Sequence, residues 1–163
     1  GLGESIQADE KTLAVYREHL AKCDVALWVI SANDRTYSYD QALITQVLTS
    51  RLKNRLVIGI SQIDLIQPGH WAEEFNVPSR EQEKSMQQKV RDVRSKLKEI
   101  GVTSRQVVPY SAHKRYHLMH LFTAMLEACP TKRRWVLDEH KAIAEFVVPG
   151  FASSPSLSSE HLP

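Results

Sequence analysis

The sequence contains little cysteine and no long apolar run. Only two of its 163 residues are cysteines, Cys23 and Cys129, and their wide separation is not the pattern of a disulfide framework. No stretch approaches the roughly 18 consecutive apolar residues that would span a bilayer. The first residues also lack the basic and apolar regions of a secretory signal. These absences predict a cytoplasmic protein in a reducing compartment.

An excess of charge of one sign is also missing. Lys and Arg number 21 and Asp and Glu number 19, so the formal net charge is only +2. A protein that binds nucleic acid mainly by neutralising phosphates is normally far more basic, so we expect no nucleic-acid partner of that kind. Hydrophobic residues make up 42% of the chain, which at this length is enough to bury a core and indicates a single folded domain.

Three short runs rich in β-branched residues predict strands, at residues 25–30, 56–60 and 107–110. Their apolar residues do not alternate with polar ones, which favours strands covered on both faces, as in a parallel sheet. Segments with helical periodicity separate the runs. The alternation of strands and helices predicts an α/β fold, a parallel sheet of three core strands with flanking helices.

The helical segments are marked by their ends. Ser38 with Gln41 and Ser79 with Gln82 match the capping box that begins a helix, and Gly101 is a typical stop. The expected helices cover approximately residues 13–20, 38–52, 79–100, 117–128 and 132–147.

The end of the chain differs in composition from the rest. Residues 149–163 are rich in Ser and Pro and too poor in apolar side chains to offset the entropy cost of ordering. We therefore expect one domain over residues 1–148 and a disordered tail over 149–163.

Polar segments follow two of the predicted strands, at the end of the sheet where open α/β folds bind ligands. Ser61-Gln62-Ile63-Asp64 follows the second run and Ser111-Ala112-His113 follows the third. These segments resemble the NKxD and SAK guanine-recognition motifs of the Era-like GTPases. The chain start, Gly1-Leu2-Gly3, resembles the end of the DxxG motif in the same family. The resemblance covers about residues 1–130 and is closest to prophage-encoded GTP-binding proteins of the YfjP/YeeP type.

The resemblance implies a P-loop-NTPase-like G domain and gives the base-recognition residues their roles. The Asp64 carboxylate would accept hydrogen bonds from the two adjacent N–H donors of guanine, and it would repel adenine, which presents an acceptor there. The main-chain N–H of Ala112 would bind guanine O6, with Ser111 and His113 in the same loop.

Two departures from the family pattern affect this site. Ser61 and Gln62 stand where the family has asparagine and lysine, so the base pocket lacks one positive charge. Gly1 would be the final glycine of the DxxG motif and would lie near the phosphates.

The phosphate-binding half of the family pattern is missing from this sequence. No segment matches GxxxxGKS or GxxxxGKT, and the residues that would bind Mg²⁺ are absent. We therefore expect an incomplete, N-terminally truncated G domain with no catalytic residue, no metal site, weak or no binding of GTP or GDP, and no hydrolysis. In such a fragment the strand at 25–30 would have an open edge, which favours self-association.

Other interpretations of the same residues remain open. The chain is alternatively a non-enzymatic interaction or scaffold protein that keeps only the fold of a GTPase. A third alternative is an RNA-associated protein that uses the basic residues of helix 79–100 and of 132–134. His113, His117 and His120 have a spacing that zinc accepts, but we favour a core helix with an exposed imidazole edge.

Overall fold

A computed structural model describes residues 10–33 and 38–134 of the chain. The predictions for Gly1, for a helix continuing through 135–147 and for a tail at 149–163 lie outside the described residues. The described part of the predicted helix 132–147 contains a short 3-10 helix, η4 (Thr131–Arg133).

The three predicted strands form one parallel sheet. They are β1 (Ala26–Ser31), β2 (Leu56–Ser61) and β5 (Val107–Pro109), in the order β1-β2-β5. Leu27 pairs with Val57 and Gly59 with Val108, so the central strand is β2. The predicted α/β fold with three parallel core strands is confirmed.

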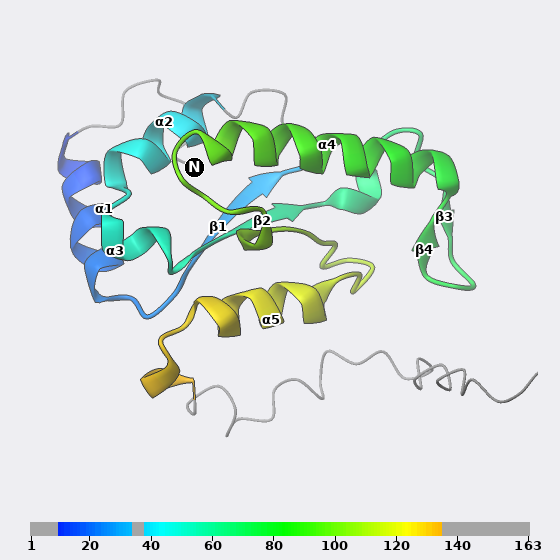
Figure 1. Cartoon of the computed structure of the whole chain (residues 1–163). Helices are drawn as coiled ribbons and strands as arrows, with labels where there is room; N and C mark the ends of the chain where they lie inside the picture. Colours follow the sequence, from blue (N-terminus) through cyan, green and yellow to red (C-terminus); the bar gives the residue numbers. More distant parts are fainter. Residues whose placement is uncertain (1–9, 34–37, 135–163) are drawn as a thin grey trace, which may run out of the picture.

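Helices cover both sides of this sheet, with α4 (Arg80–Lys98) on one side and α5 (Leu118–Ala128) on the other (Figure 1). α2 (Ser38–Val47) shares the α4 side, and α1 (Glu10–Lys22) packs against α2. A short helix, α3 (Ser50–Lys53), precedes β2. None of the helices in the described part is both long and apolar enough to cross a membrane.

The main core lies between the sheet and α4. Ile30, Ile58 and Ile60 point from the strands toward the apolar stripe of α4, and all three are almost completely buried. The stripe consists of Met86, Val90, Val93 and Leu97. The periodicity that predicts helix 79–100 therefore identifies its buried face correctly.

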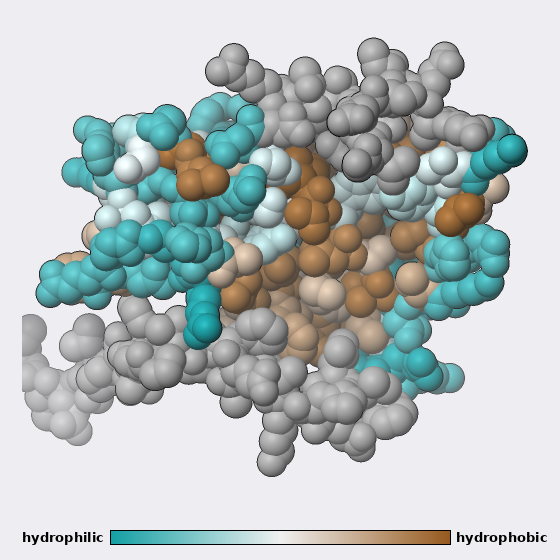
Figure 2. Space-filling model, turned by 180° about the vertical axis from the view of Figure 1, so that it is seen from behind, coloured by the Kyte–Doolittle hydropathy of each residue, from teal (hydrophilic) through white to brown (hydrophobic). Residues whose placement is uncertain are grey.

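The prediction that every strand is covered on both faces is wrong for β1. All of β2 except Ser61 is buried, but burial in β1 alternates, with Leu27 36% and Val29 50% exposed. α5 packs over Val57 and Val108, and these lie on β2 and β5. An apolar area lies at the centre of the surface seen from behind in Figure 2.

The helix ends follow the sequence signals in part. The Ser79 hydroxyl accepts from the Gln82 main-chain N–H at 3.2 Å, as predicted. The side chains of both box glutamines act elsewhere: that of Gln41 donates to Lys96 O at 3.2 Å on α4, and that of Gln82 contacts the loop after β2. At Gln82 these tertiary hydrogen bonds take the place of the side-chain half of the predicted box. Gly101, with φ 86°, ends α4 as predicted.

A small hairpin between β2 and α4 was not predicted. It consists of β3 (Trp71–Ala72) and β4 (Val77–Pro78), which pair antiparallel. Asn76, with φ 50°, makes the turn into β4. Strands of two residues have no periodicity that a sequence pattern can reveal, and this hairpin is held by contacts described below.

Candidate functional site

The structure brings the two predicted motif segments to the same end of the sheet. Ser61 ends β2, Gln62 and Asp64 lie in the loop that follows it, and the loop with Ser111, Ala112 and His113 follows the neighbouring strand β5. A main-chain hydrogen bond from Ile63 N to Tyr110 O, 3.4 Å long, joins the two loops at their bases. All six predicted residues thus lie at the ends of two neighbouring strands or in the loops that follow them.

Ser61 and Gln62 are used to join the ends of the strands. The Ser61 hydroxyl donates to Ile30 O at 3.2 Å, and the Ser31 hydroxyl donates to Gln62 Oε1 at 2.9 Å. Gln62 has φ 57°, a left-handed conformation that turns the chain sharply out of β2. These two residues therefore fix the entry of the loop through contacts with β1.

Asp64 lies in a short 3-10 turn, η2 (Ile63–Leu65), whose first residue is completely buried. Asp64 itself is half-buried. Its carboxylate makes no hydrogen bond or ion pair with any residue that the structure describes. A carboxylate held partly out of water and without a partner is an acceptor ready for a ligand with two adjacent donors.

Gln82 holds this turn from α4. The side chain is completely buried, and its Nε2 donates to Asp64 O at 2.7 Å and to Ile66 O at 3.1 Å. The sequence pattern predicts only a capping role for Gln82. The position of Gln82 in the sequence could have indicated its buried role. Gln82 occupies the same helical stripe as Met86 and Val90, where a polar side chain must find hydrogen-bond partners inside the protein.

The loop after β5 closes on itself. Ser111 is completely buried and exchanges two main-chain hydrogen bonds with Tyr116, each 3.0 Å long. The Ser111 hydroxyl also accepts from Lys114 N at 2.9 Å. Ala112 and His113, at the tip, are exposed, and no described residue accepts a hydrogen bond from their main-chain N–H groups. These donors lie at the same end of the sheet as Asp64.

The unpredicted hairpin supports the same loop. Asn76 donates through Nδ2 to Lys114 O at 2.9 Å, while its Oδ1 accepts from Trp71 Nε1 at 3.1 Å. Lys114 also forms an ion pair with Glu73. The Trp71 and Tyr116 rings meet edge to face with centroids 5.2 Å apart. No sequence signal predicted this support, because the contacts that join the hairpin to the loop connect residues about 40 positions apart or more.

The three histidines do not form one cluster. His113 is in the loop, whereas the His117 and His120 rings lie 4.6 Å apart at the start of α5. The described residues contain no group of three His, Cys, Asp or Glu side chains arranged to hold a metal ion. Burial and the neighbouring His120 lower the pKa of His117, against the opposing effect of its hydrogen bond to Pro109 O.

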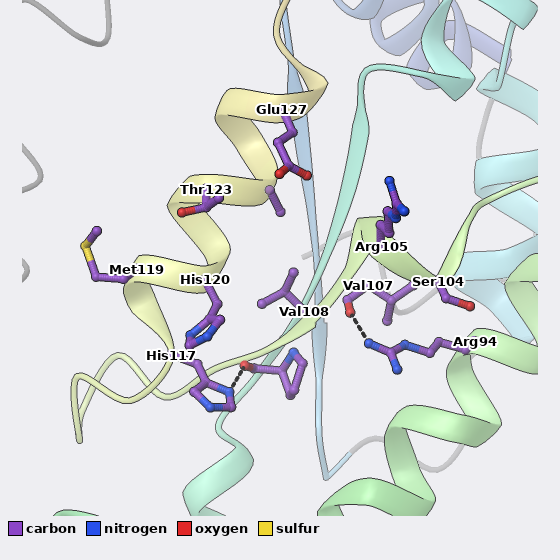
Figure 3. A pocket seen from close by; sticks show the side chains of 12 residues that line it. Arg94, Ser104, Arg105, Val107, Val108, His117, Met119, His120, Thr123 and Glu127 are labelled. Carbon is purple, nitrogen blue, oxygen red and sulfur yellow. Dashed lines mark hydrogen bonds between the residues drawn. The ribbon is translucent and has the colours of Figure 1, made fainter. Parts of the chain in front are cut away.

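A cavity of about 500 Å³ lies on the outer side of β5, between α4 and α5 (Figure 3). His117 and His120 line it together with Arg94, Arg105 and Glu127. None of the six predicted site residues lines this cavity, so it is separate from the candidate site at the strand ends.

Comparison with known proteins finds two similar sequences. No family model and no solved structure matches the chain. The chain is 33% identical over 90 residues to the uncharacterized protein YfjP of Escherichia coli K12, a match covering 55% of this chain and 30% of YfjP. It is 37% identical over 68 residues to the uncharacterized protein YkfA of the same organism, covering 42% of this chain and 24% of YkfA.

These matches span less than a third of the length of either curated relative. The names of both relatives state no activity. The chain is therefore similar to parts of two uncharacterized proteins, and its function must be argued from its own residues.

Proposed function

We propose that this chain carries the guanine-recognition end of a GTP-binding domain and by itself binds guanine nucleotides weakly, without hydrolysing them. The observation that carries the proposal is the half-buried Asp64 carboxylate, which has no partner among the described residues. The exposed Ala112 N–H, also without a described acceptor, lies on the adjacent loop.

This pairing of groups suits guanine. The base presents two N–H donors side by side and a carbonyl oxygen next to them, which match a carboxylate and a main-chain N–H respectively. Adenine presents an acceptor where guanine N1–H would meet Asp64. Binding adenine would leave the carboxylate unpaired, and this disfavours adenine by about 1–3 kcal/mol.

The expected affinity is low. Ser61 and Gln62 bond to Ile30 and Ser31, and neither supplies a positive charge. The sequence also contains no glycine-rich loop with the lysine that holds phosphates, and no set of Mg²⁺ ligands of the family type. Base contacts alone support a dissociation constant in the millimolar range, or about −4 kcal/mol.

Titrations followed by NMR test the proposal on the whole chain, with GMP, AMP and XMP as ligands. We expect GMP to bind about tenfold more tightly than AMP. Asp64→Asn should reverse the preference between GMP and XMP, because xanthine presents a carbonyl where guanine has its amino group and therefore pairs with an amide. Asp92→Asn, on the exposed side of α4, is the control and should leave the order of affinities unchanged.

Two outcomes would contradict the proposal in different ways. Failure of the three nucleotides to perturb the two loops would exclude guanine recognition and leave an interaction or scaffold role. Submicromolar binding of GDP with Mg²⁺, or turnover of GTP abolished by Asp64→Ala, would show that the chain binds phosphates by residues other than those of the family pattern.

A further inference from the structure

The free edge of β1 carries main-chain groups that have no partner among the described residues. Ala26 N donates to Arg55 O and Ala32 N donates to Ser61 O, each at 2.9 Å. Main-chain groups of a strand alternate in direction, so every second residue from 26 to 32 faces β2. The N–H and C=O of Leu27, Val29 and Ser31 therefore point away from the sheet.

The opposite edge of the sheet is closed. The outward groups of β5 belong to Val107 and Pro109. Val107 N donates to Ser104 O, and Val107 O accepts from Arg94 Nη2 at 3.1 Å. Pro109 has no N–H, and its carbonyl accepts from His117 Nδ1 at 3.3 Å (Figure 3). Every outward main-chain group of β5 thus has a hydrogen-bond partner, except at Pro109, where the N–H does not exist.

β1 lacks two of the usual features that protect an edge strand. Its sequence, ALWVIS, contains no charge and no proline. The residues whose main chain faces outward also expose apolar side chains on the α5 side of the sheet, with Val29 at 50%. The only charged side chain just before the strand, Asp24, is paired with Arg133 at 3.0 Å.

We propose that a second copy of this chain pairs with β1, antiparallel and about a two-fold axis at Val29. In this arrangement Val29 faces Val29 of the second copy, and Leu27 faces its Ser31. The outward residues form hydrogen-bonded pairs that exchange about six main-chain hydrogen bonds. The two parallel sheets become one continuous sheet.

Self-pairing follows from the chemistry of the strand itself. A two-fold axis at Val29 places this residue opposite its own copy, so a charge there would meet a like charge, and β1 has no charge at any position. Leu27 and Val29 of each copy become diagonal neighbours on the same face, which removes apolar surface from water. The outward N–H and C=O groups of each copy become the hydrogen-bond partners of those of the other.

Sedimentation of the full chain over a range of concentrations tests the proposal with two matched variants. Val29→Lys adds a charge on the edge without altering the β1–β2 hydrogen bonds, because the Val29 main chain faces outward. Phe75→Lys makes the same change at a hairpin residue that is 60% exposed. We expect the wild-type chain and Phe75→Lys to form dimers with the same dissociation constant. Val29→Lys should raise the dissociation constant of the dimer about tenfold or more.

A cysteine crosslink tests the register. Residues in a hydrogen-bonded antiparallel pair have Cα atoms about 5.5 Å apart, within the range that a disulfide joins. Val29→Cys should therefore form a 29-to-29 crosslink between copies, identified by mass spectrometry, whereas Phe75→Cys should not crosslink under the same oxidation. Circular dichroism checks that each variant is folded.

Three results would overturn the proposal. They are a wild-type chain that stays monomeric at about 100 μM, a dimer that Val29→Lys does not weaken, or slow amide exchange at Leu27 and Val29 in dilute monomer. The last result would mean that another part of the same chain covers the edge. None of these outcomes bears on guanine binding, which is tested separately at Asp64.

Discussion

The side-chain amide of Gln82 lies 2.7 Å from the main-chain carbonyl of Asp64, a residue 18 positions earlier in the sequence. This contact attaches the loop after β2 to the first turn of α4. The same amide also donates to Ile66 O, so one buried side chain holds both the middle of the η2 turn and the residue that follows it. The position of the Asp64 carboxylate therefore depends on how α4 is seated against the sheet.

Replacing Gln82 by leucine should destabilise the fold and loosen the Asp64 loop. The carbonyls of Asp64 and Ile66 would lose a buried donor, at a cost of about 1–3 kcal/mol in the free energy of unfolding. Urea denaturation measures the effect. Gln87→Leu is the control, because Gln87 is an exposed residue on the same helix, bonded only to Glu83 among the described residues, and should change stability by about 0.5 kcal/mol or less. Equal stability of the two variants would contradict the assigned role.

Stability should fall as the pH is lowered below about 6.5, the ordinary pKa of histidine. Burial lowers the pKa of His117 in the folded protein, so the unfolded chain binds a proton first, and acid favours unfolding. The stabilising contribution of neutral His117 is complete at pH values above its pKa in the unfolded chain. It is lost as the pH falls through its pKa in the folded protein. The ring faces His120, Tyr116 and the Pro109 carbonyl, with Arg94 and Glu127 across the cavity.

His117→Asn should flatten this pH dependence between pH 5 and 7, as followed by urea denaturation at each pH. Asparagine tolerates the left-handed conformation of residue 117, where φ is 59°. His113→Asn, at the exposed loop tip, is the matched control and should keep the wild-type slope. A slope unchanged by His117→Asn would show that other groups cause the acid sensitivity.

Gly101→Ala should lower stability through the main chain alone. Gly101 has φ 86°, and the N–H groups of Gly101 and Val102 donate to Lys98 O and Leu97 O at the end of α4. An alanine there costs about 1 kcal/mol, while its Cβ meets only the flexible end of Lys53, 3.3 Å away. Thermal unfolding should show Gly101→Asn less affected. Gly69→Ala, whose φ is not in the left-handed region, should change little, and an equal loss at both glycines would contradict this explanation.

The sheet and the α4 stripe were predictable because their signals are local. The apolar run at 56–60 and the spacing of Met86, Val90, Val93 and Leu97 each record the burial of one element. The exposed face of β1 was not predictable in this way. Its run is as apolar as that of β2, and only the presence or absence of a neighbour decides whether Leu27 and Val29 are covered.

The candidate site was predictable in position and not in detail. The strand-end rule placed Asp64 and Ala112 on adjacent loops. The contacts that hold these loops, from Gln82 and from Asn76, come from segments that fold against them from elsewhere in the chain. A capping pattern explains the Gln82 main-chain N–H but cannot reveal where its side chain bonds.

The closed edge at β5 also limits how large any assembly through this sheet can become. Chains that stack strand upon strand into fibres need an accepting edge at both ends of every added unit. Here Val107 O and Pro109 O are occupied by Arg94 and His117, so one end of the sheet cannot accept a strand. Addition at β1 therefore terminates the growth of the sheet, and the stoichiometry stays finite even though an apolar edge is exposed.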